Sequence, residues 1–242
     1  MVSVILVRPQ MGENIGAAAR AMQNFNLTDL RLVAPRDGWP NERAHTMSAG
    51  ALNQMPPAQV FDTLESATSD LHYCFATTAR TRDMVKPSFT PEGAAIEGHK
   101  RQSNGQGIGI LFGAERTGLL NEEIAHAQST ISIPTNPDFS SLNLGQSVLL
   151  LAYEWMKHTD LSASTQNLNM GDSFPASQGE VQNFISRLDK DLEDKNFYRS
   201  DDLKPTMQKN IQNIFTRADI TDQELRTLHG ILSALRGNKS QK

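Results

Sequence analysis

The sequence is poor in cysteine and has no long apolar run. Cys74 is the one cysteine among 242 residues, so the chain can form no internal disulfide and cannot build a cysteine-based zinc site alone. No stretch approaches the roughly 18 consecutive apolar residues that a membrane-spanning helix requires. These absences exclude a disulfide-stapled scaffold and predict a cytoplasmic protein that does not cross a membrane.

Positive charge is also scarce. Lysine and arginine together number 23 against 27 aspartates and glutamates, which gives a formal net charge of −4. Because phosphate binding usually leaves a basic footprint, this balance argues against a broad nucleic-acid-binding surface. Any contact with RNA would depend on a small local patch or on cations from two subunits. The six histidines show no metal-ligand spacing, so no metal site is expected.

Residues 1–158 alternate short apolar runs with helical patterns. This alternation predicts an α/β domain with a mainly parallel sheet and helices on both faces. The predicted strands are 2–7, 29–33, 71–77, 108–113 and 130–134. The predicted helices cover 15–25 and 91–101, begin at 121, and cover 144–158.

The composition changes after this domain. Residues 159–178 are rich in Ser, Thr, Asn and Gly, have little to bury and are interpreted as a linker. Three helical patterns follow in 179–242, without a strand signal. A helical extension of this size has room for only a small core, so we expect it to pack on the main domain or on a partner subunit.

The first block that could carry chemistry is E-N-I-G-A-A-A-R-A-M at 13–22, directly after the first predicted strand. Its run of small residues lets a helix lie very close to a neighbouring backbone, and its N-terminus offers free N–H groups to an anion. Asn14 is the predicted N-cap. Taken alone, the block favours a tightly packed helix with a surface arginine, Arg20, over a functional site.

The second block is L-F-G-A-E-R-T-G-L at 111–119, where an apolar strand ends in Gly113. In open α/β sheets ligands bind beyond the carboxyl ends of the strands, and glycine lets the backbone approach a ligand closely. Taken alone, the block fits a strand–turn–helix connection equally well.

The third block covers 136–147 and precedes the strongly apolar helix. Its polar residues could simply cap that helix. However, Ser140, Ser141 and Asn143 exceed the number of side chains that one cap uses. The excess indicates ligand contacts.

In this order, N-I-G-A-A-A-R-A-M, L-F-G-A-E-R-T-G-L and S-S-L-N-L resemble the SPOUT superfamily of methyltransferases, in its tRNA/rRNA 2′-O-ribose branch. The whole chain, including the ending F-T-R-A and L-R-T-L-H-G-I-L, is similar to TrmJ-type enzymes, which methylate the ribose of nucleotide 32 in the tRNA anticodon loop. The resemblance implies S-adenosylmethionine as methyl donor, tRNA as substrate, a C-terminal trefoil knot in the catalytic domain, and a homodimer with active sites at the subunit interface.

The resemblance also implies roles for individual residues. Arg20 is the leading catalytic residue; because a guanidinium is very hard to deprotonate, we expect it to hold a phosphate and stabilise the nascent alkoxide rather than act as a base. The other expected catalytic residues are Asn14, Glu115, Ser141 and Asn143. The positions matching cofactor binding are Thr77, Thr78, Ala79, Gly113, Ile133, Ser141, Leu142 and Asn143. The expected RNA contacts are Arg80, Arg82 and Arg20.

Two alternatives stay open at this point. One is a SPOUT methyltransferase that acts on rRNA or on another tRNA position, because substrate choice depends on RNA-facing surfaces outside the three blocks. The other is a non-catalytic RNA-binding protein that kept the fold.

Overall fold

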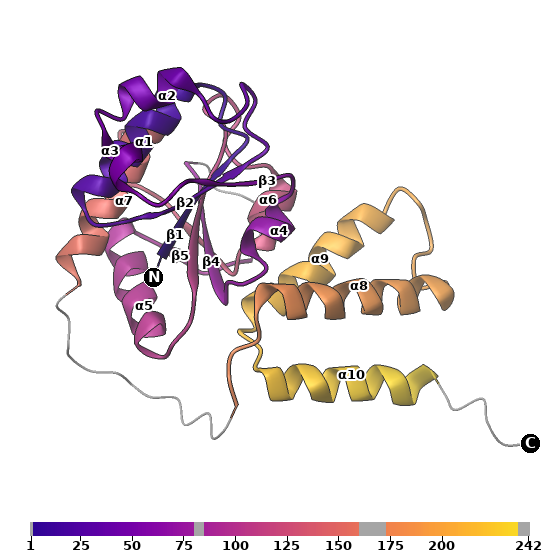
Figure 1. Cartoon of the computed structure of the whole chain (residues 1–242). Helices are drawn as coiled ribbons and strands as arrows, with labels where there is room; N and C mark the ends of the chain where they lie inside the picture. Colours follow the sequence, from indigo (N-terminus) through magenta and orange to yellow (C-terminus); the bar gives the residue numbers. More distant parts are fainter. Residues whose placement is uncertain (1, 80–84, 160–172, 237–242) are drawn as a thin grey trace, which may run out of the picture.

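A computed structural model describes residues 2–79, 85–159 and 173–236. It contains an α/β unit and, beside it, three helices from the C-terminal part of the chain (Figure 1). No helix within the described ranges is both long and apolar enough to span a bilayer.

The α/β unit is built on one seven-stranded sheet with the order β3-β2-β1-β6-β4-β7-β5. The strands are β1 (Val2–Val7), β2 (Asp29–Val33), β3 (Gln59–Phe61), β4 (Tyr73–Thr77), β5 (Ser88–Phe89), β6 (Ile108–Phe112) and β7 (Ser129–Ile131). Every neighbouring pair runs parallel, so all carboxyl ends share one edge of the sheet. The predicted mainly parallel α/β fold is confirmed.

Helices cover both faces of this sheet. They are α1 (Gly12–Asn24), α2 (Glu42–Met47), α3 (Ala51–Gln54), α4 (Leu64–Thr68), α5 (Pro91–Ser103), α6 (Asn121–His126) and α7 (Leu144–Lys157). Alternate residues of β1 enter different cores: Val4 and Leu6 pack with α1, α5 and α7, whereas Ile5 and Val7 pack with α4 and α6. The strand is therefore buried at every position and apolar at all but Ser3, as expected for a sheet covered on both sides.

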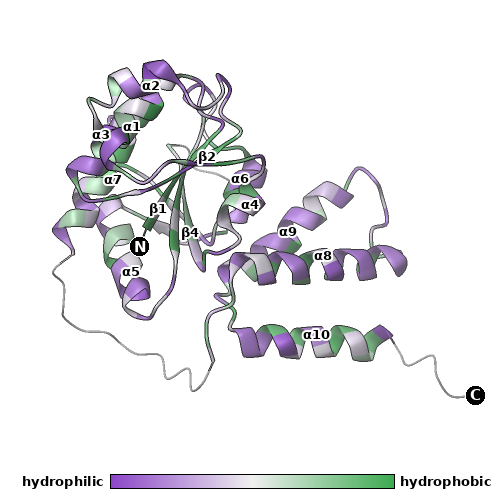
Figure 2. Ribbon diagram, viewed as in Figure 1, coloured by the Kyte–Doolittle hydropathy of each residue, from purple (hydrophilic) through white to green (hydrophobic). Residues whose placement is uncertain are grey.

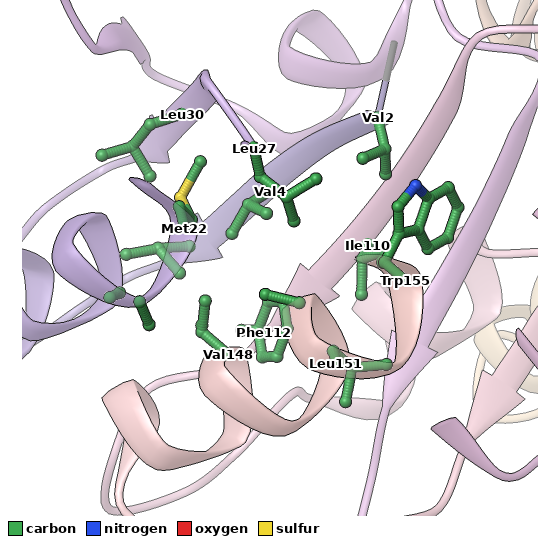
Figure 3. Packing of buried hydrophobic residues seen from close by; sticks show 14 of the residues in the cluster. Val2, Val4, Met22, Leu27, Leu30, Ile110, Phe112, Val148, Leu151 and Trp155 are labelled. Atoms are coloured by element: carbon green, nitrogen blue, oxygen red, sulfur yellow. The ribbon is translucent and has the colours of Figure 1, made fainter. Parts of the chain in front are cut away.

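The larger core lies between the sheet and α7. Figure 3 shows Val148, Leu151 and Trp155 of α7 on the same side as Ile110 and Phe112 of β6, all of them buried. The predicted apolar helix is thus the main cover of this face.

The small residues of α1 let it pack closely against two other helices. A Cβ added at Gly145 of α7 would lie 2.8 Å from the Cβ of Ala17, and one added at Gly16 would lie 2.2 Å from the backbone oxygen of Ala44. These distances confirm the close approach predicted for the block. The predicted start of the helix was wrong, because Met11 is the N-cap and Asn14 lies inside the first turn.

The C-terminal helices are α8 (Gln178–Asp194), α9 (Lys204–Arg217) and α10 (Asp222–Arg236), and they share a core of their own around Phe184. Helix α8 packs against α4, and α9 packs against α6. The backbone N–H of Gln178 donates to the oxygen of Leu71 at 2.7 Å. Figure 2 shows hydrophobic colour on the central strands and mostly hydrophilic colour along α8 and α9.

Candidate active site

A cavity of about 220 Å³ opens at the carboxyl ends of β4, β6 and β7. Its walls are formed by 77–79, 112–119, Ile131, Ile133, Thr135, 140–142, Leu144 and Ser147. The walls therefore come from the end of β4, from the second and third sequence blocks and from the segment after β7. This is the position at which parallel α/β sheets bind ligands.

The predicted cofactor positions gather here, except Asn143, which is not part of the cavity walls. Two hydrogen bonds hold the strand ends together. The hydroxyl of Thr77 donates to the oxygen of Leu111 at 2.8 Å, and the N–H of Thr78 donates to the oxygen of Ile131 at 2.9 Å. These bonds place backbone groups of three strands around one space.

Gly113 is required by the tight turn that follows β6. A Cβ at this position would lie 2.1 Å from both the carbonyl carbon of Gly118 and the nitrogen of Leu119. The turn is closed by a 2.7 Å hydrogen bond from the N–H of Gly118 to the oxygen of Ala114, and Gly118 has a φ of +66°. Both glycines let this turn fold back onto the strand end, where it forms one cavity wall.

Glu115 connects the turn to the first block. Its carboxylate accepts backbone N–H groups from Gln10 at 2.8 Å and Met11 at 3.2 Å, at the start of α1. It also accepts the side-chain amide of Asn14 at 2.8 Å, and the Asn14 oxygen accepts the amide of Asn143 at 2.9 Å. The three blocks are thereby joined by one hydrogen-bond chain, and a carboxylate at a helix N-terminus is favourable.

Asn143 caps α7 and also takes part in the hydrogen-bond chain beside the cavity. Its side-chain oxygen accepts the N–H of Gly145 at 2.8 Å and caps α7, while Gln146 completes a capping box. Its amide is the group that binds Asn14. The hydroxyl of Ser141 beside it lines the cavity and bonds to none of the described residues.

Arg20 lies apart from these groups. It is exposed on α1, does not line the cavity and makes no hydrogen bond or ion pair with any described residue. Helix geometry places it about 120° around α1 from Asn14 and about 9 Å along the axis. The chain therefore brings Asn14, Glu115, Ser141 and Asn143 together without Arg20. Arg80 and Arg82 lie outside the described residues.

Arg116 is a site residue that the sequence reasoning missed. It follows Glu115, lines the cavity, is exposed and has no partner within the described ranges. Its place in the loop after a strand end could have revealed it.

One cluster among the described residues has the composition of a metal site. Ligand atoms of Glu92, Glu154 and His158 lie within 4.8 Å of one another, at the opposite end of α7 from the cavity. Lys157 pairs with Glu154 at 2.9 Å, so one carboxylate of this cluster already has a cationic partner, and the sequence spacing did not predict the cluster.

Comparison with known proteins decides the family. The SpoU rRNA Methylase family matches residues 1–153, which include all three blocks. The chain belongs to this family.

The similarity of this SpoU methylase to other proteins extends through its C-terminal helices. It is 33% identical over 235 residues to the tRNA (cytidine/uridine-2′-O-)-methyltransferase TrmJ of Photorhabdus laumondii, covering 97% of this chain and 96% of that one. The crystal structure of TrmJ from Z. mobilis ZM4 has 44% identity and a TM-score of 0.88, covering 98% of this chain and 99% of that one.

A putative methylase family protein from Neisseria gonorrhoeae has 26% identity and a TM-score of 0.68, covering 77% and 93% of the two chains. The chain is thus a methyltransferase enzyme, and the TrmJ-type resemblance read from the sequence is confirmed.

Proposed function

We propose that this SpoU methylase transfers a methyl group from S-adenosylmethionine to a ribose 2′-hydroxyl of tRNA, at nucleotide 32 of the anticodon loop. The observation that carries the proposal is the hydrogen-bond chain of Glu115, Asn14 and Asn143, which joins three distant blocks beside one cavity. The relatives similar over 97% of the chain, named tRNA (cytidine/uridine-2′-O-)-methyltransferases, support tRNA as the substrate class.

The cavity residues fit S-adenosylmethionine. Apolar side chains of Ile133 and Leu142 stand beside backbone groups of the strand ends and the hydroxyls of Thr77 and Ser141. A nucleoside with a charged amino-acid tail needs this mixture of apolar wall and polar atoms. The Ser141 hydroxyl, which binds none of the described residues, is free to contact such a ligand.

The proposed mechanism depends on position and charge. S-adenosylmethionine supplies an electrophilic methyl group when it is bound. We expect Ser141 to orient the ribose from the cavity wall, while Glu115 holds Asn14, and through it Asn143, in place beside the cavity. The guanidinium of Arg20 holds the neighbouring phosphate and stabilises the oxyanion that develops as the hydroxyl proton leaves to water.

We further propose a homodimer with the active sites at the subunit interface. Helix α7 exposes Leu149, Leu150, Tyr153 and Met156 at between 39% and 47% of their surface. Their spacing puts these side chains on one outer stripe of the helix. The edge of Tyr153 meets Phe25 at the end of α1, at a centroid distance of 5.9 Å. Since Arg20 does not reach its own cavity, a second copy packed on this stripe would complete the site.

This interface can be tested by Leu150→Glu, which places a charge on the stripe without touching the cavity. Sedimentation should show a monomer, and methyl transfer should be lost with it. A dimer that persists with full activity in this variant would refute the interface.

We propose three parts for this chain: a catalytic domain at 1–158, a linker at 159–178 and a helical extension at 179–242. We also propose that the enzyme is cytoplasmic. Separate apolar cores in the sheet unit and in α8–α10 support the division. The trefoil knot implied by the resemblance is proposed for the C-terminal part of the catalytic domain. Its support is that the chain after β7 returns as α7 against α1 and α5.

The decisive experiment is methylation of tRNA and rRNA transcripts by the purified protein, with the modified ribose mapped by mass spectrometry. We expect methylation at nucleotide 32 of tRNA, and its loss from the tRNA of cells that lack the protein. Methylation confined to rRNA or to another tRNA nucleotide would refute the substrate assignment. Failure to bind S-adenosylmethionine in calorimetry would instead indicate a non-catalytic RNA-binding homologue.

A further inference from the structure

Lys86 is partly buried where the α/β unit meets the C-terminal helices. Its Nζ donates to the backbone oxygens of Ala125, at 2.9 Å, and of Ala127, at the end of α6. It also donates to the hydroxyl of Thr216 in α9 at 3.3 Å. One amine thus connects the segment before β5, the α6–β7 connection and the C-terminal helices.

A second contact from α9 holds the same segment. The Nη1 of Arg217 donates to the backbone oxygen of Val85 at 3.3 Å. The Val85 side chain is 78% exposed, so packing of that side chain does not fix the segment. Thr216 is 2% exposed, and its hydroxyl also bonds to the oxygen of Ala125 at 3.2 Å. Thr216 and Arg217 of α9 therefore hold Lys86 and Val85, respectively, by hydrogen bonds.

The held segment is linked to the cavity by a short series of hydrogen bonds. Pro87 follows Lys86, and its oxygen accepts the N–H of Thr130 in β7 at 2.9 Å. The next residue of β7, Ile131, lines the cavity and accepts the N–H of Thr78, another wall residue. This series of hydrogen bonds connects the segment at Lys86 to both strands that form this wall.

We propose that Lys86 is a positioning residue through which the docking of α9 sets the cavity wall formed by β7 and β4, and with it the affinity for S-adenosylmethionine. This inference rests on the cofactor assigned in the proposed function. Burial, together with the nearby Arg217, lowers the pKa of Lys86 to about 7. Its partners are two backbone oxygens and one hydroxyl, so replacing the amine by an apolar side chain removes the donor that joins α6 to α9.

The test uses the full chain and measures the S-adenosylmethionine Kd by calorimetry for Lys86→Met, Thr216→Val and Arg217→Gln. We expect Lys86→Met to weaken binding by about 3- to 30-fold, the range found for residues that couple distant sites. Adding the α9 substitutions to Lys86→Met should weaken it little further, because all three changes break one connection.

The matched control is Lys209→Met. Lys209 also reaches from α9 to α6, where its Nζ lies 3.9 Å from Glu122, but it does not contact 85–86. Its removal should leave the cofactor Kd within about twofold of the wild-type value, a spread ordinary for exposed ion pairs. Equal weakening by Lys209→Met would overturn the proposal, because the effect would then reflect general loosening of the interface.

Amide hydrogen exchange is the second measurement, for use when Lys86→Met does not fold or the wild-type protein binds no S-adenosylmethionine. Amide exchange at Thr78, Thr130 and Ile131 should be faster in Lys86→Met, or in Thr216→Val if Lys86→Met does not fold. Unchanged exchange in a folded variant overturns the proposal. If the wild-type protein binds no S-adenosylmethionine, the proposed function fails, and the exchange at β7 still decides whether Lys86 positions the wall.

Discussion

Substitution of Gly113 by alanine tests whether the tight turn after β6 shapes the cavity that we propose for the cofactor. The added methyl group would lie 2.1 Å from two backbone atoms of Gly118 and Leu119, where ordinary contact begins at 3.4 Å. The turn must therefore move by about 1.3 Å, because backbone atoms cannot rotate away as a flexible side chain can.

The expected magnitudes follow from this displacement. Overpacking of a rigid site costs typically 1–3 kcal/mol, so we expect the free energy of unfolding to fall by about 2–3 kcal/mol. For a chain of this size that loss lowers the Tm by about 5–10 °C. The same displacement moves the wall that carries Glu115 and Arg116, and a shift of about 1 Å at an active site can reduce turnover by about 100-fold.

Thermal unfolding measures the loss of stability, calorimetry measures the cofactor affinity, and methyl-transfer kinetics measure the turnover. Gly230→Ala is the control, because nothing lies within 4 Å of the added Cβ in the exposed helix α10. It should stabilise the chain by about 0.5–1 kcal/mol without changing turnover. Wild-type cofactor affinity and turnover in Gly113→Ala would show that the turn does not shape the cavity.

Three further predictions concern charge. Arg20→Ala and Arg20→Lys should each lower turnover by about 100-fold at unchanged cofactor Kd; near-normal turnover in both would remove Arg20 from the mechanism. Glu115→Gln should lower the free energy of unfolding by about 2 kcal/mol, because an amide cannot accept all the N–H groups that the carboxylate binds. Denaturant unfolding measures this loss, and Glu122→Gln, at an exposed carboxylate, is the control. Lys86 has a pKa lowered to about 7, so between pH 7 and 10.5 it binds fewer protons in the folded than in the unfolded chain. The free energy of unfolding should therefore rise by about 1.5 kcal/mol from pH 7 to 8.5, and by less in Lys86→Met. Equal pH dependence of the free energy of unfolding in the two proteins would contradict this.

Strong apolar periodicity made much of the sheet predictable. The bounds of β1 and β2 agree with the sequence prediction because both strands are largely buried and rich in Val, Ile and Leu, although Ser3 and Arg31 interrupt the apolar runs. The short strands β3 and β5 were missed, since two or three residues carry no periodic signal; Val60 of β3 is even 49% exposed. The short helices α2, α3 and α4 escaped detection for the same reason.

The site shows the limit of local sequence rules. Asn14 fits the preferences of an N-cap, but its amide and oxygen are used by Glu115 and Asn143, which lie 101 and 129 residues away in the sequence. A long-range network thus overrides the local preference, and helix α1 starts one turn earlier at Gly12. No sequence pattern marks Lys86, because its partners Ala125, Ala127 and Thr216 lie 39 to 130 residues away in the sequence.

The acidic composition gives the proposed dimer an electrostatic consequence in addition to the proposed completion of the site. Arg8 pairs with Glu123 at 2.8 Å and Arg43 with Glu13 at 3.3 Å, so part of the positive charge near the start of α1 is already neutralised. Arg20 and Arg116 are exposed, have no partner among the described residues and are therefore available to meet phosphate. RNA affinity grows with the number of phosphates neutralised, and two such arginines per chain neutralise few. The proposed dimer would double this number, which is how we expect an acidic enzyme to hold a structured RNA.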